Sequence, residues 1–185
     1  MKLTVFQAEK GDGLLLASAD GRTLLLDGGM PAAYKSHLAP TLAKLDRLDA
    51  VSVSHIDQDH IGGILAMVDD LFAWRVHDYQ RKHGNSTHPK PAVPRPPAFS
   101  KVWHNVLHEM LGENSGEISD MLAAKARVLA GGERLESGVR HLFRAATTRH
   151  TDLAQSTREA IRLARRLGNG QLGVNVNPEF AGKLM

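Results

Sequence analysis

The sequence predicts an α/β fold, and three observations support this. Short apolar runs alternate with glycine-containing turns through the first third of the chain. Leucines at helical spacing then lead into a continuous apolar run, residues 50–54, that is typical of a buried strand. From about residue 70 onward, helical patterns replace the strand pattern. This order predicts a sheet with helices packed against it.

Three short strands in a meander are expected first. Their apolar runs cover residues 3–6, 14–17 and 23–26, and turn signals such as Asp20-Gly21 separate them. The third run ends at Asp27-Gly28-Gly29. The helix that follows is predicted from apolar positions three and four residues apart, namely Leu38, Leu42, Leu45 and Leu48. Another helix is expected to begin at Gly62-Gly63.

The second part of the chain is predicted to be helical around a proline-rich linker. Residues 88–97 hold too many prolines for a helix or a central strand, so they are expected to be extended. Helices are predicted around His104 and His108, from Ile118 to Leu129, and from about Asp152 to Leu167. The predicted organisation is therefore a core at 1–70, a helical insertion at 71–170 and a tail at 171–185.

Composition limits the chemistry. The chain has no cysteine, so a bound metal must use nitrogen and oxygen ligands. No stretch has the length and apolarity of a signal peptide or a membrane span, which predicts a cytoplasmic protein. Residues 1–70 hold 6 Lys and Arg against 10 Asp and Glu, whereas residues 71–185 hold 17 against 10. A basic half suits a polyanionic ligand, although a solvated helix face explains the same charges.

The segment after the buried strand holds the candidate metal ligands. His55, Asp57, Asp59 and His60 occur within six residues, between a strand and a helix. Alternate positions of an extended segment point the same way, which lets the first three side chains converge. We expect two cations, one held by His55 and Asp57 and the other by Asp59 and His60. A surface turn that caps the next helix needs one such residue, not four.

This run, with Gly62-Gly63 after it, resembles the signature of metallo-β-lactamase-fold hydrolases, with Asp57 in place of a histidine. Residues 7–13 and 24–29 add a likeness to the subgroup typified by the hydrolase domain of the DNA-uptake protein ComEC. The resemblance covers residues 1 to about 70 and implies the N-terminal half of an αββα sandwich. It implies that Asp59 binds metal and orients the nucleophile, and that Asp27 hydrogen-bonds the metal loop.

The resemblance also implies a function. Two divalent metals, with Zn²⁺ favoured and Mn²⁺ or Fe²⁺ as competitors, would activate a water in a phosphodiesterase or nuclease. The alternatives are hydrolysis of a small ester, thioester or lactam, and a non-catalytic regulatory or assembly subunit. The basic residues of the last helix are candidate contacts to nucleic-acid phosphates, namely Arg158, Arg162, Arg165 and Arg166.

A partner chain is predicted as well. The family's later ligands, an aspartate after glycine and a His-His-Gly, do not occur after residue 60. The chain is therefore expected to be the N-terminal half of the fold and inactive alone. The C-terminal half that completes it is separately encoded or cleaved from a precursor, or the chain is an isolated fragment. A half sandwich would expose an apolar sheet face, which recruits a partner.

Overall fold

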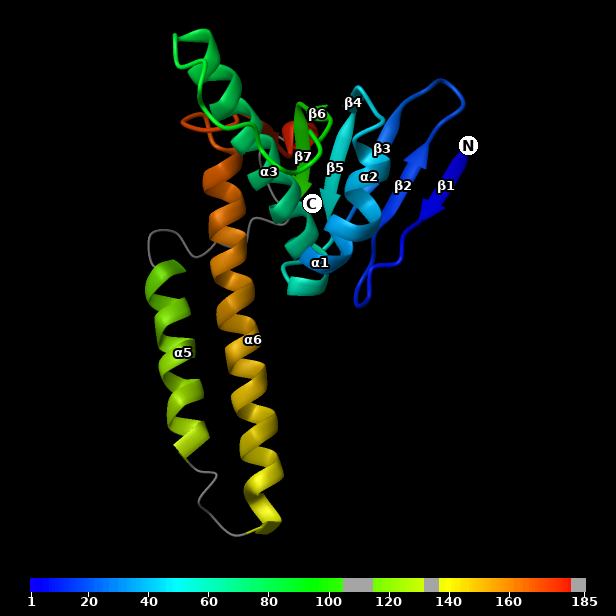
Figure 1. Ribbon diagram of the computed structural model, residues 1–185. Helices are drawn as coiled ribbons and strands as arrows, with labels where there is room; N and C mark the ends of the chain where they lie inside the picture. The colour runs from blue at the N-terminus through cyan, green and yellow to red at the C-terminus, as the bar shows by residue number, and fades with distance from the viewer. Residues whose placement is uncertain (105–114, 132–136, 181–185) are drawn as a thin grey trace.

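A mixed sheet covered by helices forms the body of the molecule in the computed structural model, which describes residues 1–104, 115–131 and 137–180 (Figure 1). The six strands lie in the order β1-β2-β3-β5-β7-β8. The prediction of a mixed α/β architecture is confirmed at this level.

The N-terminal strands form the predicted meander. β1 (Lys2–Val5), β2 (Leu14–Ala17) and β3 (Thr23–Leu26) pair antiparallel, with Leu3 opposite Leu16 and Leu16 opposite Leu24. The turn between β2 and β3 closes through hydrogen bonds from the Ser18 N–H to the Arg22 carbonyl and from the Arg22 N–H to the Ser18 hydroxyl. All three strands match the apolar runs because leucine runs bounded by glycine turns are strong local signals.

The remaining strands of this sheet are parallel. β5 (Ala50–Val53) pairs with β3, β7 (Lys101–His104) pairs with β5, and β8 (Asn175–Val176) pairs with β7. A second, two-stranded sheet joins β4 (Arg47–Leu48) to β6 (Ala98–Phe99). The main sheet thus takes in strands from all three predicted segments, and the division at residues 70 and 170 stays a prediction.

The helices connect these strands. A short helical stretch, α1 (Pro31–Ala33), η1 (Tyr34–Leu38) and α2 (Ala39–Leu42), links β3 to β5. α3 (Gln58–Lys82) links β5 towards β7, and α5 (Ser115–Gly131) and α6 (Ser137–Leu167) lie between β7 and β8. A 3₁₀ turn, η4 (Pro178–Phe180), follows β8.

Three predictions about these elements are corrected. The helix predicted to carry Leu38, Leu42, Leu45 and Leu48 ends at Leu42. Leu48 lies in the strand β4 instead, and its side chain is buried in the core. α3 begins at Gln58, four residues before Gly62, so His60 lies in its first turn. His104 belongs to a strand, not a helix, because Val102 and His104 are buried beside β5, and tertiary pairing overrides the local helical pattern. His108 lies outside the described residues.

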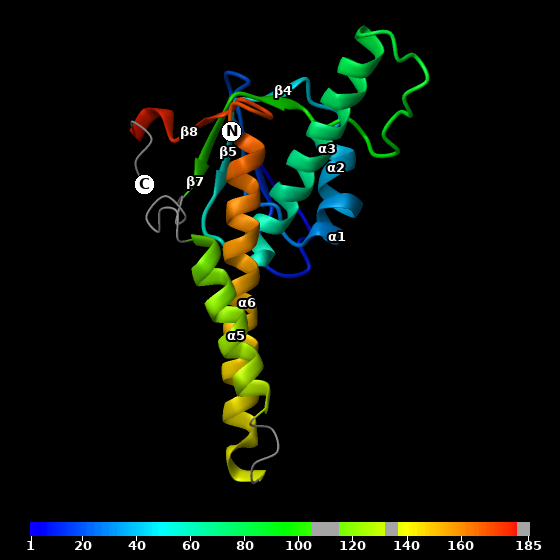
Figure 2. The same ribbon diagram turned by 90° about the vertical axis from the view of Figure 1, so that its left-hand side faces the viewer.

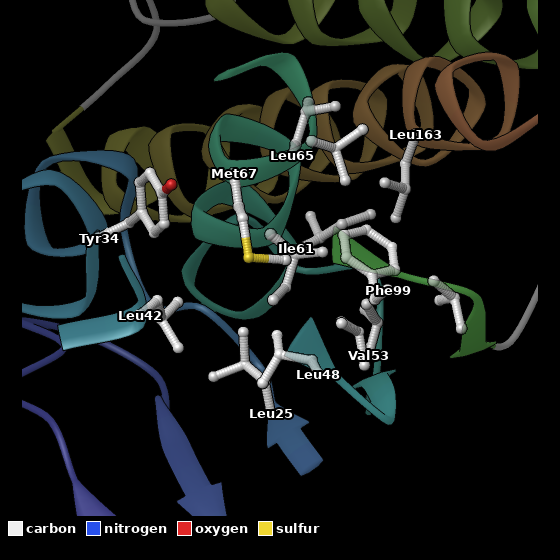
Figure 3. Close-up of a cluster of buried hydrophobic side chains, with 14 of the residues drawn as sticks. Leu25, Tyr34, Leu42, Leu48, Val53, Ile61, Leu65, Met67, Phe99 and Leu163 are labelled. Carbon is white, nitrogen blue, oxygen red and sulfur yellow. The ribbon is translucent and has the colours of Figure 1, made fainter. Parts of the chain in front are cut away.

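The hydrophobic core lies on one face of the main sheet. Its strand residues alternate along each strand and include Leu15, Leu25, Val51 and Val102. Tyr34 and Leu42 from the first helical stretch, with Ile61, Leu65 and Met67 from α3 and Leu163 from α6, pack on them (Figure 3). All the helices of this core therefore cover the same sheet face.

α5 and α6 form a helical hairpin that projects from the body (Figures 1 and 2). Only the C-terminal part of α6 enters the core, through Ala160, Leu163 and Leu167. Asp69 of α3 accepts hydrogen bonds from Arg162 and Arg166, at 2.6 and 2.7 Å, on the same side. The middle of α6, from Arg149 to Ser156, passes beside the start of α3. No described helix is long and apolar enough to cross a membrane.

Candidate metal-binding site

Glycines bring the metal loop against the end of β3. Gly28 N–H donates to the carbonyl of His60 at 3.0 Å, and Gly63 N–H donates to that of Gly29 at 2.9 Å. A Cβ on Gly63 would lie 1.9 Å from the Gly28 carbonyl oxygen, and one on Gly28 would lie 2.4 Å from the Ile64 nitrogen. Only glycine at both positions allows this approach, so the backbone itself fixes the loop.

Asp27 then orients the loop's side chains. Its side chain is 2% exposed and its backbone has a positive φ of 55°. The carboxylate accepts hydrogen bonds from the Ser54 N–H at 2.8 Å and the Ser54 hydroxyl at 2.6 Å. Nδ1 of His60 lies 2.9 Å from the same carboxylate and donates to it. The proton on Nδ1 leaves Nε2 of His60 with a lone pair for a cation.

Ser54 fixes a second imidazole in the same way. Because its hydroxyl proton points to Asp27, the Ser54 oxygen accepts at its other contact, from Nδ1 of His55 at 2.9 Å. Nε2 of His55 therefore also has a lone pair with which it can coordinate a metal. The two imidazole rings lie 3.7 Å apart between centroids. Two histidine lone pairs are thus held side by side.

The metal cluster consists of His55, Asp59 and His60. One ligand atom from each lies within 4.8 Å of the other two. Asp59 sits in the first turn of α3, where the helix dipole favours a negative charge. Two imidazole nitrogens and one carboxylate oxygen suit Zn²⁺ and leave a fourth position open. These three residues therefore fit a divalent cation, and they would coordinate it without a change in the backbone conformation.

Asp57 lies beside this cluster, next to His55, and is not one of its three residues. Its carboxylate is 63% exposed and 3.7 Å from Nε2 of His55. A second group of potential ligands, Asp12, Asp27 and His60, shares His60 with the metal cluster. The Asp27 carboxylate and Nδ1 of His60 are already joined by their hydrogen bond. Among the described residues, the geometry thus favours one cation over the two that the sequence predicted, and the number of metals stays a prediction.

A cavity of about 400 Å³ opens beside the metal cluster. This volume lies in the range of small-ligand sites. The metal loop forms one side through Asp57, Gln58 and Asp59, and the middle of α6 forms the other. The α6 residues are Arg149, Asp152, Leu153, Gln155 and Ser156, and Lys10 and Met30 complete the lining.

Two cations in this lining are available to a ligand. Lys10 and Arg149 are exposed, and within the part of the chain that the structure describes neither forms a salt bridge. Sequence reasoning did not single out either residue. Arg149 lies 90 residues from Asp59 and comes near it only because α6 packs across the start of α3. The basic composition of residues 71–185 was the one signal that pointed this way.

Glu159 connects the two sides of the cavity. Its Oε1 accepts hydrogen bonds from the side-chain amides of Gln58, at 3.5 Å, and Gln155, at 3.2 Å. Its Oε2 is buried without a hydrogen-bond partner among the described residues. Burial raises the pKa of this carboxyl above its ordinary value. The hydrogen bond between Glu159 and Gln58 thus connects α6 to the residue next to Asp59.

The four arginines predicted to contact phosphates lie elsewhere on α6. Arg158 pairs with Asp120 at 3.2 Å, and Arg162 and Arg166 pair with Asp69. Arg165 is exposed and has no ion pair among the described residues. None of the four lines the cavity beside the metal cluster. Three of them attach helices to one another, and their role towards a ligand stays a prediction.

One comparison with known proteins identifies a family. A family model described as "Anti-Pycsar protein Apyc1" matches residues 6–165, which is most of the chain and includes the metal loop and the cavity-lining part of α6. No curated protein matches the chain. No solved structure matches it either.

This match corrects the resemblance drawn from the sequence. The family found is that of Anti-Pycsar protein Apyc1, not one of metallo-β-lactamase hydrolases, and no solved structure supports the αββα sandwich. The predicted hydrolase, with its nuclease, phosphodiesterase and small-ester alternatives, is overturned by the same finding. The motif misled because its ligand spacing indicates a metal site, which does not by itself specify a reaction.

Proposed function

This chain belongs to the family of Anti-Pycsar protein Apyc1, and we propose that it counters Pycsar by binding a cyclic nucleotide at a metal centre. The observation that carries the proposal is the metal cluster at the edge of a small cavity with two available cations. The role is regulatory: the bound ligand is withdrawn from solution.

The phosphate of the ligand accounts for the charges in the cavity. A divalent cation held by His55, Asp59 and His60 would supply an open coordination position for a phosphate oxygen. Lys10 and Arg149 add positive charge from the loop and from α6. Arginine donates two parallel hydrogen bonds to phosphate oxygens, which gives it direction as well as charge. The anionic part of the ligand is thus held from both sides of the cavity.

The remaining lining suits a base and a sugar. Met30 and Leu153 offer apolar contact, and Gln58 and Gln155 offer side-chain amides that both donate and accept. Small-ligand sites combine apolar surface with a few placed polar groups in this way. The cavity volume of about 400 Å³ favours a single mononucleotide over a polymeric nucleic acid.

The test is titration calorimetry with the four common 3′,5′-cyclic mononucleotides. The chain is first freed of metal by chelation and then measured with and without one equivalent of Zn²⁺. We expect at least one nucleotide to bind, and its affinity to fall by more than about tenfold when the metal is removed. Binding that is equal with and without metal would contradict the proposal, as would no binding under either condition.

A matched pair of histidine variants locates the effect. His55→Ala removes a cluster nitrogen, and His37→Ala removes an exposed imidazole from η1. The first variant should lose the metal-dependent part of nucleotide binding, and the second should bind as the unmodified chain does. Equal binding by the two variants would place the site elsewhere.

A further inference from the structure

Two glutamines face the cavity beside the metal cluster, and one carboxyl group holds both. Gln58 is the first residue of α3, and Gln155 lies one helical turn before Glu159 on α6. The amide nitrogen of Gln155 donates to Oε1 of Glu159 at 3.2 Å, and that of Gln58 donates to the same oxygen at 3.5 Å. We call Gln58 and Gln155 the amide pair. The pair takes one glutamine from each side of the cavity.

Glu159 determines which way round each amide lies. A glutamine amide can turn over and exchange its oxygen and nitrogen, and the neighbouring groups decide between the two orientations. An ionised carboxylate accepts hydrogen bonds and cannot donate them, so the amide nitrogens face Glu159. The neutral carboxyl allows the same arrangement, because its proton can lie on Oε2 while Oε1 accepts. The carbonyl oxygens of the amide pair are therefore directed away from Glu159.

The carboxyl group that orients the amide pair has a fixed position. Its Oε2 is buried, and the next residue, Ala160, is 1% exposed and belongs to the hydrophobic core. Leu163 anchors the following turn of α6 in that core, and Arg162 bonds to Asp69 of α3 at 2.6 Å. Glu159 thus lies where α6 is attached to the body. The amide pair is preorganised before a ligand enters, which lowers the cost of ordering it on binding.

The amide pair leaves hydrogen-bond acceptors for a ligand. Within residues 1–104, 115–131 and 137–180, neither carbonyl oxygen of the pair accepts a hydrogen bond. Each of these oxygens has two lone pairs. The carboxylate of Asp152, on the same side of the cavity as Gln155, is a further acceptor. This part of the lining therefore favours a ligand group that donates hydrogen bonds.

An exocyclic amino group is the complement of two carbonyl oxygens. Cytosine and adenine carry such a group, and it offers one N–H to each member of the amide pair. Uracil has a keto oxygen at the position where cytosine has its amino group. A keto oxygen that faces two carbonyls leaves three acceptors without a donor, and unpaired polar groups in a site cost binding free energy. The lining thus distinguishes amino bases from keto bases.

We propose that the amide pair selects cyclic nucleotides whose base carries an exocyclic amino group, and that Glu159 is the positioning residue of the pair. The inference rests on the proposed function, because it takes the phosphate to be held at the metal cluster and by Arg149. It adds which bases are bound: cytosine is preferred over uracil, and adenine over hypoxanthine.

The first test compares 3′,5′-cyclic CMP with 3′,5′-cyclic UMP by titration calorimetry on the zinc-loaded chain. We expect the cytosine nucleotide to bind about tenfold more tightly. Cyclic AMP and cyclic IMP, which differ in the same way, should show a preference in the same direction. Equal affinities or a keto preference, with binding that still requires the metal, would overturn this inference alone. If no nucleotide bound, the proposed function would fall with it.

Gln155→Leu locates the preference on the amide pair. The variant loses one carbonyl acceptor, so the affinity for cyclic CMP should fall by about fivefold to tenfold, and that for cyclic UMP should change less than about twofold. Gln80→Leu is the matched control, because Gln80 lies near the other end of α3 and does not line the cavity. It should leave both affinities unchanged. An equal loss for the two nucleotides in Gln155→Leu would show that this residue does not contact the base's amino group.

Glu159→Leu tests the positioning role. Without Glu159 the amides can present either their oxygens or their nitrogens to the base, so the ratio of the two affinities should fall to about two or less. The affinity for Zn²⁺ should not change, and circular dichroism checks that the variant is folded. A general loss of structure would weaken both nucleotides without changing their ratio. An unchanged preference for cyclic CMP in the folded variant would therefore overturn the role of Glu159.

Discussion

The two sides of the cavity are built by different means. The metal loop is held by buried backbone contacts at Gly28 and Gly63 and by the carboxylate of Asp27. The α6 side is an exposed helix surface that carries Arg149, and side-chain packing and Glu159 connect it to α3. The loop is therefore preorganised for a cation, whereas the α6 side can vary without disturbing the fold. The predictions below test that division of roles.

The largest effect is expected from Gly63→Ala. The added Cβ would lie 1.9 Å from the Gly28 carbonyl oxygen, and backbone must move to relieve the clash. We expect the free energy of unfolding to fall by about 3 kcal/mol or more, with a melting temperature about 6–12 °C lower. Thermal unfolding followed by circular dichroism measures this. Gly170→Ala is the control, because nothing lies within 4 Å of a Cβ there. Equal melting of the two variants would show that the loop is not fixed by this contact.

Asp27→Asn should weaken metal binding while the chain stays folded. The amide has no charge and cannot hold both the Ser54 N–H and Nδ1 of His60 as the carboxylate does. We expect the affinity for Zn²⁺ to fall by about 10–100-fold in a competition assay with a chromogenic chelator. Asp46→Asn, on an exposed residue, should leave the affinity unchanged. An unaltered affinity in Asp27→Asn would mean that His60 does not take its orientation from Asp27.

A local sequence pattern brings the residues of the metal side together, whereas the α6 side depends on the packing of distant segments. His55, Asp59 and His60 lie within six residues, so a local pattern places them together, and Asp27 was expected to support them. β1, β2, β3 and β5 were found for the same reason, whereas the residues of β4 were expected to be helical. Arg149 and the strand β7 depend on which distant segments pack together, and neither periodicity nor composition specifies that. The ligand motif could not reveal the family either, since it reports metal chemistry alone.

Arg149→Ala should have a smaller effect, confined to the nucleotide. The guanidinium is exposed, so solvent screens its contribution, and we expect nucleotide affinity to fall by about threefold to tenfold. The affinity for Zn²⁺ should not change. Arg165→Ala removes an exposed arginine of α6 outside the cavity, and it should bind nucleotide normally. If Arg149→Ala weakened metal binding instead, the two sides of the cavity would not be separable.

The smallest effect is expected from Glu159→Gln. Burial raises the pKa of Glu159 in the folded chain above its unfolded value, so the folded state binds more protons between the two pKa values. Stability therefore falls as the pH rises through that window. The variant, which cannot ionise, should melt up to about 3 °C higher than the unmodified chain at pH 7. The difference should disappear below pH about 4, where both states of the unmodified chain are protonated. A difference that is independent of pH would assign the effect to packing.

The claim that His55, Asp59 and His60 hold one divalent cation is tested most directly by X-ray absorption on the zinc-loaded chain, combined with elemental analysis of the same sample. We expect one zinc per chain, coordinated by nitrogen and oxygen, with two imidazole ligands that fall to one in His55→Ala. A zinc-free chain, or zinc whose imidazole ligands are unchanged in His55→Ala, would contradict it.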